Sequence, residues 1–411
     1  GRAGLPAPAV EGVRFALVRS RGRDAVPVRS VMFGAALTVF VLTASFTYSS
    51  SLASLVGHPS LYGWNFNTLL VTSDTTTLTP TVSPAMAAAF NSDPRVAAWS
   101  RLLFTSSVDV DGQPVPLMLE PPRSRVSPPL LSGHEIEAIH QVLVGPETLA
   151  ALHKRVGDEV TASSGGAKLR VRIVGTATFP ATGLGGTLHP ALGVGALAWA
   201  TIVGSALGPI KGCGGEANEI AVRFRAGVSA RAARAETRHL AAVANRGFAS
   251  LPVTSPCAGD RFAAAGLQRP AEIVNYRSMG ATPAVVGATL TGASLVALAV
   301  ALVASVRRRR RDLAVFKSLG FTRRQIAATI AWQSTITMIV GVVVGVPTGV
   351  VAGRWMWTSF ANVIHVVPRV VVPWLTIGVV VVVALVVANV AAAVPAWRAA
   401  ATEAAPGLRA E

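Results

Sequence analysis

The sequence has 411 residues, of which 51% are hydrophobic and 14% are charged, and its mean hydropathy is +0.51. Soluble globular chains are about 25% charged, so this composition predicts an integral membrane protein that carries one sizeable polar domain. The formal net charge is +17, but residues 51–280 hold 19 Lys and Arg against 15 Asp and Glu. Most of the positive charge therefore flanks apolar segments, where it orients a membrane chain, and no nucleic-acid partner is expected.

The N-terminal part of the chain predicts a cytosolic segment and then one membrane span. Residues 1–29 hold six Arg interrupted by apolar side chains such as Phe15 and Leu17, which is typical of a segment at the membrane interface. Residues 30–52 carry no charge and exceed the roughly 20 helical residues that cross the hydrocarbon. We expect them to form the first transmembrane helix.

Residues 53–277 have the composition of an α+β domain, either one large domain or two small ones. Residues 168–174 and 219–225 alternate polar and apolar side chains, as half-buried strands do. Residues 83–90 and 230–246 have helical composition. We expect this α+β domain to lie outside the cytosol, between the first and second spans.

Two aromatic residues follow the first span in the run Leu61–Asn65. Tyr62 and Trp64 are expected either at the outer membrane interface or inside the α+β domain.

The α+β domain holds the two cysteines of the chain, Cys213 and Cys257. An even number of cysteines in a loop-rich, exposed domain fits one disulfide formed in an oxidising compartment. Two free thiols remain the alternative. A zinc site is not expected, because the sequence has neither a Cys-x-x-Cys motif nor clustered histidines.

Three more uncharged stretches complete the predicted membrane part. Residues 278–306, 325–353 and 371–397 are each long enough to span a bilayer and are expected to form the second, third and fourth transmembrane helices. The fold class predicted is therefore an α-helical integral membrane protein with four transmembrane helices and a large α+β domain between the first two.

The charge of the connecting segments predicts the orientation of these spans. The N-terminal segment, the hairpin of residues 307–324 and the tail of residues 398–411 hold 16 Lys and Arg, whereas the loop of residues 354–370 holds two. Basic segments stay in the cytosol, so both termini are expected there and the 354–370 loop outside. Aromatic anchors at the outer interface are expected at Trp355, Trp357 and Trp374.

The third predicted span has a regular glycine stripe. Gly341, Gly345, Gly349 and Gly353 recur every four residues and share one helix face, which lets a second backbone approach closely. Glycine is frequent in membrane helices by chance, but the strict register favours a packing groove. Pro347 inside the span is expected to bend it.

The hairpin of residues 307–324 begins with five consecutive Arg and continues with Asp312. Leu313, Phe316 and Leu319 follow at helical spacing, and Gly320 is placed to end the helix. Thr322 and Gln325 then form a capping-box pattern, which predicts the start of the next helix. A basic loop that only fixes topology is the alternative interpretation.

Residues 309–326 read Arg-Arg-Arg-Asp-Leu-Ala-Val-Phe-Lys-Ser-Leu-Gly-Phe-Thr-Arg-Arg-Gln-Ile. In order and spacing this segment resembles the cytosolic coupling hairpin of the FtsX/MacB-like permeases of ABC transporters. The order of one span, a large domain and three more spans is similar to that family over essentially the whole chain. The run Leu61–Asn65 resembles two-unit members, and with the Gly1 start it favours the second unit of a longer chain.

The resemblance implies a permease subunit that is not itself an enzyme and binds no cofactor, with ATP entering through a separate cytosolic ABC ATPase. The implied partners also include the lipid bilayer and a second permease unit, in the same chain or as a homodimer, in the bacterial cytoplasmic (inner) membrane. A lipid, lipoprotein, peptide or drug-like substrate is implied. The residues implied to couple the ATPase are Arg311, Asp312, Leu313, Phe316, Leu319, Gly320, Arg323 and Arg324.

Two other functions stay open from the sequence. The chain can be a mechanical regulator that activates a cell-wall hydrolase without transporting anything, or a membrane-anchored sensor or enzyme without an ATPase.

Motifs of enzyme chemistry are missing from the sequence. It has no Gly-x4-Gly-Lys-Ser/Thr loop and no Gly-x-Ser-x-Gly elbow. His134, Glu135 and His140 do not form a His-Glu-x-x-His motif and are expected to be surface residues. The predicted spans contain no charged residue, so they offer no carrier for an intramembrane proton relay.

Overall fold

The computed structural model describes residues 6–17, 28–72, 84–164, 166–180, 192–202, 219–249, 261–265, 273–275 and 322–401, with a few isolated positions between 285 and 300. The chain divides into two compact units. The helical unit comprises residues 1–54, 278–358 and 370–411, and the β-rich unit comprises residues 55–277 and 359–369.

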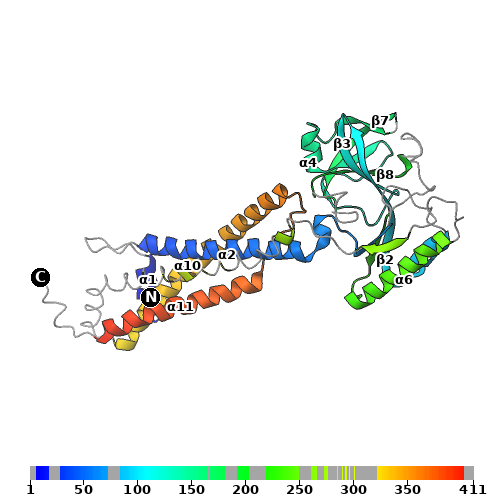
Figure 1. Cartoon of the computed structure of the whole chain (residues 1–411). Coiled ribbons are helices and arrows are strands. Elements are labelled where there is room, and N and C mark those ends of the chain that lie inside the picture. The colour runs from blue at the N-terminus through cyan, green and yellow to red at the C-terminus, as the bar shows by residue number, and fades with distance from the viewer. Residues whose placement is uncertain are drawn as a thin grey trace. The chain divides into compact units, whose positions relative to one another are not determined.

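Apart from the isolated positions between 285 and 300, the described part of the helical unit consists of four helices, labelled in Figure 1. They are α1 (Ala7–Leu17), α2 (Val28–Gly57), α10 (Arg323–Val363) and α11 (Trp374–Ala401). The last residues of α2 and α10, residues 55–57 and 359–363, are grouped with the β-rich unit. Pro347 lies inside α10, which is helical on both sides of it.

Two stretches among the described residues are long and apolar enough to cross a membrane, Met32–Gly57 and Arg324–Val363. The described apolar stretch Trp374–Val390 is shorter, and the predicted second span, residues 278–306, lies almost entirely outside the described residues. Two candidate spans are therefore found where four were predicted. The predicted loop of residues 354–370 begins as helix, since the sequence offers no glycine or proline between Gly353 and Val363 to stop α10.

The β-rich unit contains two lobes, each with its own core. The first lobe is a sheet of β1 (Thr68–Thr72), β9 (Glu219–Phe224), β10 (Phe262–Ala265) and the first half of β2 (Val96–Val110). Helices α3 (Pro84–Ser92) and α6 (Ala230–Ala249) supply side chains to the same core. Its centre includes the buried residues Leu70, Phe90, Ile220, Val222 and Leu240.

The second lobe is a ring of six strands. Its strands are the second half of β2, β3 (Gln113–Glu120), β8 (Ala196–Trp199), β5 (Gln141–Val144), β7 (Ala167–Ala177) and β6 (Glu159–Ser164). Each strand pairs with the next in that order, and β6 pairs with β2, which closes a small barrel. Strand β4 (Leu130–Gly133) pairs with β7, and the short helix α4 (Pro146–Ala151) follows β5.

The two lobes share strand β2. Its residues 96–102 pair with β9 in the first lobe, and its residues 103–110 pair with β3 in the second, with an irregularity between Thr105 and Val108. Bulges of this kind bend a strand and increase its twist. The sequence left open whether the domain has one or two parts, and the structure shows two cores connected by one continuous strand.

The predicted strands and helices of the domain are formed, but their burial differs from the sequence pattern. In β9 every residue except Arg223 is buried, although the predicted pattern alternates. Alternating polar and apolar residues predict a strand with one face exposed to solvent, whereas both faces of β9 are buried. Residues 168–174 lie within β7, and the predicted helices 83–90 and 230–246 correspond to α3 and α6.

The aromatic residues near the ends of the helices fall into two groups. Tyr62 and Trp64 are buried in the β-rich unit, which decides between the two alternatives left by the sequence. Trp355 and Trp374 are exposed, as anchors at an interface would be, but Trp357 is fully buried and packs edge-on against Tyr48 with ring centroids 5.9 Å apart. The expectation that Trp357 is an exposed anchor is therefore wrong, because its ring is buried and packs against Tyr48 of α2.

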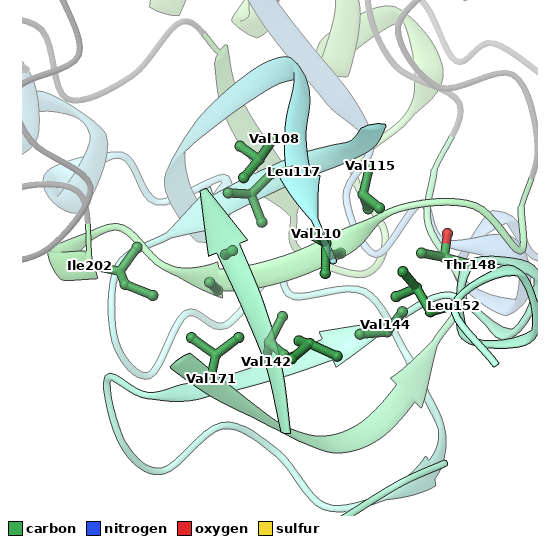
Figure 2. Close-up of a pocket in the computed structure, with 14 residues that line it drawn as sticks. Val108, Val110, Val115, Leu117, Val142, Val144, Thr148, Leu152, Val171 and Ile202 are labelled. Carbon is green, nitrogen blue, oxygen red and sulfur yellow. The ribbon is translucent and has the colours of Figure 1, made fainter. Parts of the chain in front are cut away.

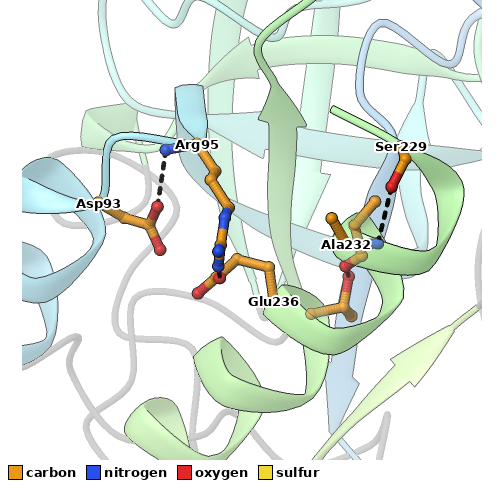
Figure 3. A network of polar contacts seen from close by, with 7 residues as sticks. Asp93, Arg95, Ser229, Ala232 and Glu236 are labelled. Atoms are coloured by element: carbon orange, nitrogen blue, oxygen red, sulfur yellow. Dashed lines mark hydrogen bonds and ion pairs between the residues drawn. The ribbon is translucent and has the colours of Figure 1, made fainter. Parts of the chain in front are cut away.

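A polar contact fixes α6 against the start of β2 (Figure 3). The guanidinium of Arg95 forms an ion pair with Glu236, whose side chain is almost fully buried on α6. The backbone N–H of Arg95 also donates to Asp93, and Ser229 caps the helix by accepting the N–H of Ala232 at 3.2 Å. A capping serine satisfies a backbone donor that the helix leaves open.

Candidate functional site

The four glycines of the predicted stripe lie directly against α2. A Cβ atom on Gly345 would lie 2.7 Å from the Ala36 carbonyl oxygen, and one on Gly349 would lie 2.7 Å from that of Phe40. Gly341 and Gly353 face Ala35 and Ala44 at similarly short distances. Any side chain larger than hydrogen would therefore collide with the α2 backbone, and the glycines let the two helices touch along about 18 Å of α10.

The order of these contacts gives the relative direction of the helices. The contacts advance together along both chains, from Gly341 with Ala35 to Gly353 with Ala44, so α2 and α10 run parallel. Helix α11 runs the opposite way, because Ser334 near the start of α10 bonds to Asn389 near the end of α11. This pattern fits the predicted first, third and fourth spans, in which odd and even spans run in opposite directions.

Small polar side chains on α2 continue the contact beside the glycine groove. The hydroxyl of Thr47 donates to the Thr43 carbonyl at 2.8 Å, and that of Ser51 donates to the Thr47 carbonyl at 2.7 Å. Ser51 Oγ also accepts the backbone N–H of Val371, at 3.0 Å, just before α11. Because each hydroxyl has a backbone partner, these residues lie inside an apolar bundle without an unsatisfied polar group.

Asn389 links α10 and α11 and was missed by the sequence analysis. Its Oδ1 accepts the hydroxyl hydrogen of Ser334 at 2.9 Å, and its Nδ2 donates to Thr335 Oγ1 at 3.2 Å and to the Leu385 carbonyl at 2.9 Å. A signal for it was present, since Asn389 is the one amide side chain in the stretch 371–397. An isolated amide among valines indicates an interhelical hydrogen bond.

The described residues include only the end of the predicted coupling hairpin. The capping box is confirmed, with the Thr322 N–H bonded to Gln325 Oε1 at 2.8 Å and the Gln325 N–H to Thr322 Oγ1 at 3.4 Å. Arg323 and Arg324 open α10, and the Arg324 side chain is exposed. The other predicted coupling residues, Arg311, Asp312, Leu313, Phe316, Leu319 and Gly320, lie outside the described residues.

Helix α1 packs on the first part of α10, close to where the hairpin ends. A Cβ atom on Gly12 would lie 2.5 Å from Trp332 Cβ and 2.7 Å from the Thr329 carbonyl oxygen. Ala9, one turn earlier, is fully buried. The missing side chain at Gly12 therefore lets α1 approach α10 closely.

Cys213 and Cys257 lie outside the described residues, so the disulfide stays a prediction. His134, Glu135 and His140 are exposed, as expected for surface residues. Among the described residues, no group of three or more His, Cys, Asp or Glu side chains is arranged to hold a metal ion.

The barrel of the β-rich unit encloses a cavity of about 30 Å³ (Figure 2). Its lining is apolar, with valines such as Val110, Val144 and Val171 pointing inward. Thr148 is the polar residue of the lining, and its hydroxyl accepts the Gly195 N–H at 2.8 Å. An apolar cavity without unpaired polar groups does not hold water. We therefore interpret this cavity as part of the core and not as a catalytic site.

Two buried carboxyl groups of the β-rich unit are shifted toward the neutral form. Burial raises the pKa of Glu219 to about 8, and its carboxyl has no hydrogen-bond partner among the described residues. Burial also raises the pKa of Glu120 to about 7, against the opposing effect of the hydroxyl that Ser127 donates at 2.7 Å. Neither group is among the residues that line the cavity, and the described residues form no metal-binding cluster, so we assign the two carboxyls no catalytic role.

The surfaces and contacts of the helices are those of a membrane protein. The helices expose large apolar side chains such as Val351 and Val386 instead of polar ones, which a helix facing water would carry. Their contacts rely on small residues and interhelical hydrogen bonds, as in a membrane. The class is therefore a helical membrane protein with an attached β-rich unit.

The comparison with known families makes this class specific. Residues 284–404 match the family model described as FtsX-like permease C-terminal. The match confirms the resemblance seen in the hairpin and extends from the predicted second span through the fourth. It supports a permease-type role of the kind found in ABC transporters. No curated protein matches the sequence significantly.

Proposed function

We propose that this chain is the membrane subunit of an ABC transporter and that a separate cytosolic ATPase supplies its energy. The observation that carries the proposal is the family match over residues 284–404, which contains the whole of the basic hairpin. The chain has no phosphate-binding loop of its own, so it does not hydrolyse ATP itself.

The proposed topology has four spans with both termini in the cytosol and the β-rich unit outside, in a bacterial cytoplasmic membrane. The parallel course of α2 and α10 supports it, since the first and third spans must both run outward. The opposite course of α11 supports a fourth span that returns to the cytosol. The charge difference between 16 basic residues in the proposed cytosolic segments and two in the 354–370 loop favours the same orientation.

The hairpin of residues 307–324 is the proposed docking element for the ATPase. Phe316 and Leu319 lie three residues apart and provide the apolar anchor, while the arginines form a charged rim. Buried apolar anchors dominate the energy of such contacts, and rim charges mostly change association rates. The capping box at Thr322 places the first turn of α10 directly after the hairpin, so a push on the hairpin reaches α10 without an intervening loop.

The proposed substrates are amphipathic or apolar molecules at the outer membrane face, namely a lipid, lipoprotein, peptide or drug-like compound. The described spans support this, because their buried hydroxyls and the Asn389 amide bond to the protein and line no charged path. A second permease unit, in the same chain or as a homodimer, is the proposed partner for the exposed apolar faces of the helices that do not meet lipid.

The test removes the anchor and keeps the topology. Phe316→Ala with Leu319→Ala should reduce copurification of the ATPase and its stimulation by at least tenfold, while membrane insertion stays intact because Arg307 to Arg311 remain. The matched control replaces Arg307 and Arg308 with Ala and should change both quantities less than threefold. Full ATPase binding and turnover in the Phe316/Leu319 variant would show that the hairpin only fixes topology.

A further inference from the structure

We infer that α10 acts on the β-rich unit directly, through a joint formed by residues 359–369 and centred on the contact between His365 and Glu147. The inference rests on the proposed function, because it concerns where the motion caused by the ATPase enters the outer part of the protein. A route through the first two spans alone would leave the connection between the third and fourth spans without a mechanical role.

The joint belongs to the β-rich unit although it connects two helices of the helical unit. Residues 359–369, which include the last turn of α10, group with the β-rich unit and not with the bundle. Ala361 and Val366 are fully buried there. The Val367 N–H donates to the Leu61 carbonyl at 3.0 Å, four residues after α2 ends. The side chains and backbone groups of a surface loop are mostly exposed to water. This segment instead buries two apolar side chains and bonds to the domain, so it is part of the domain.

The centre of the joint is a three-way contact between His365, Glu147 and Gly193. His365 Nδ1 lies 3.3 Å from the Glu147 carboxylate, and Glu147 lies in the first turn of α4. A Cβ atom on Gly193 would lie 2.6 Å from His365 Nδ1 and 2.8 Å from Glu147 Cγ, so only glycine leaves room for both side chains. The Gly193 carbonyl in turn accepts the Glu147 N–H at 2.9 Å.

The backbone conformation of His365 indicates that the surrounding residues fix its position. Its φ is +56°, in the left-handed region, which costs a non-glycine residue free energy and persists where the surroundings fix it. The side chain is thereby turned toward α4, a helix that begins directly after barrel strand β5. A displacement of the end of α10 therefore reaches the barrel at α4.

The course of α10 explains why this joint is suited to transmit motion. The helix is continuous from Arg323, next to the capping box of the hairpin, to Val363, two residues before His365. At about 1.5 Å per residue, its 41 residues extend about 60 Å. One helix thus begins at the proposed ATPase-docking hairpin and ends inside the β-rich unit.

The experiment uses hydrogen exchange of the purified complex of the full chain with its ATPase, with and without a non-hydrolysable ATP analogue. In the unchanged protein the analogue should alter exchange in both the first turns of α10 and α4. His365→Asn retains a residue that tolerates the left-handed backbone, and Glu147→Gln removes the charge of a half-exposed side chain. Each should reduce the nucleotide-dependent change at α4 by at least twofold, while the change at the start of α10 and the ATPase rate stay within twofold.

His134→Asn is the matched control, since it replaces an exposed histidine of the same domain and should leave the α4 response unchanged. An α4 response of full size in both joint variants would overturn the joint while leaving the proposed function standing. A complex in which the nucleotide analogue changes neither α10 nor α4 would overturn the proposed function and the joint together.

Discussion

The helical unit and the β-rich unit are held together in opposite ways. In the bundle the closest contacts occur where side chains are missing, as at Gly345 and Gly349 against the backbone of α2. In the β-rich unit the cores are filled by large side chains such as Phe90, Met118 and Ile173, all fully buried. The difference follows from the solvent of each part. Apolar side chains gain nothing by leaving lipid for another helix, whereas in water their burial drives folding.

The two units are therefore expected to tolerate different kinds of substitution. A bundle specified by close backbone approach is sensitive to added volume, and a core specified by buried volume is sensitive to lost volume. Because the units have separate cores, substitutions can test the effect of added volume in the bundle and of lost volume in the β-rich unit independently.

The largest effect is expected from removing volume in the β-rich unit. Phe90 is fully buried and packs against Trp99 with ring centroids 5.1 Å apart. Phe90→Ala should destabilise this unit by about 3–5 kcal/mol, measured as loss of hydrogen-exchange protection in α3 and β9 of the full chain. Phe33→Ala, at a position 69% exposed on α2, is the control and should leave that protection unchanged. Equal protection in both variants would mean that Phe90 is not a core residue.

The buried carboxyl of Glu219 should make the β-rich unit less stable as the pH rises. Burial raises its pKa from an ordinary value of about 4.5 to about 8, so the folded protein holds a proton that the unfolded chain releases. The contribution of Glu219 to the free energy of unfolding is therefore largest below pH 4.5, falls between pH 4.5 and 8 and is constant above. The fall amounts to a few kcal/mol, since one pKa unit corresponds to about 1.4 kcal/mol.

Thermal unfolding of the full chain at pH 5 and pH 8 measures this effect. In Glu219→Gln the difference between the two midpoints should shrink, with a smaller slope left by Glu120, whose pKa is shifted in the same direction. An unchanged pH dependence in Glu219→Gln would contradict the assignment.

Added volume in the bundle should have the next largest effect. Gly345→Leu forces α10 away from α2 and should cost about 1–3 kcal/mol, seen as a lower yield of folded protein in detergent and faster proteolysis of the bundle. Gly34→Leu is the matched control on α2, since a Cβ atom at Gly34 meets no described atom within 4 Å. Equal behaviour of the two variants would show that the groove does not specify the bundle.

The smallest effect is expected from the hydrogen bonds between α10 and α11. Asn389→Leu removes the bonds to Ser334 and Thr335 and should cost about 0.6 kcal/mol, the average for such bonds in membranes. The thermal midpoint in detergent should fall by a few degrees at most. Val390→Leu, at the neighbouring exposed position, serves as the control. A loss as large as that of Gly345→Leu would mean that polar bonds and not close packing hold the bundle.

The sequence predicted the features that depend on neighbouring residues. The register of Gly341 to Gly353, the capping box of Thr322 and Gln325 and the helix α6 can all be recognised from residues of one continuous segment. The hairpin motif also indicated the family whose model matches residues 284–404. In each case a period or a short pattern carries the information.

The features that it missed depend on residues far apart in the chain. Closure of the barrel requires β6 to pair with β2, about 50 residues earlier, and no local pattern specifies such a pairing. The burial of Trp357 depends on Tyr48, and the place of residues 359–369 depends on Leu61 and Glu147. Asn389 was visible in the sequence, but its partners on α10 were not.

We expect this membrane chain to work with a separate ATPase. The most direct measurement is to express the unchanged chain with candidate ABC ATPases from the same genome, purify the chain in lipid nanodiscs, and measure the ATPase that stays bound and its ATP turnover. The account predicts stable copurification and a turnover that differs at least severalfold from that of the ATPase alone. An ATPase that does not bind, or whose turnover is the same with and without this chain, would contradict it.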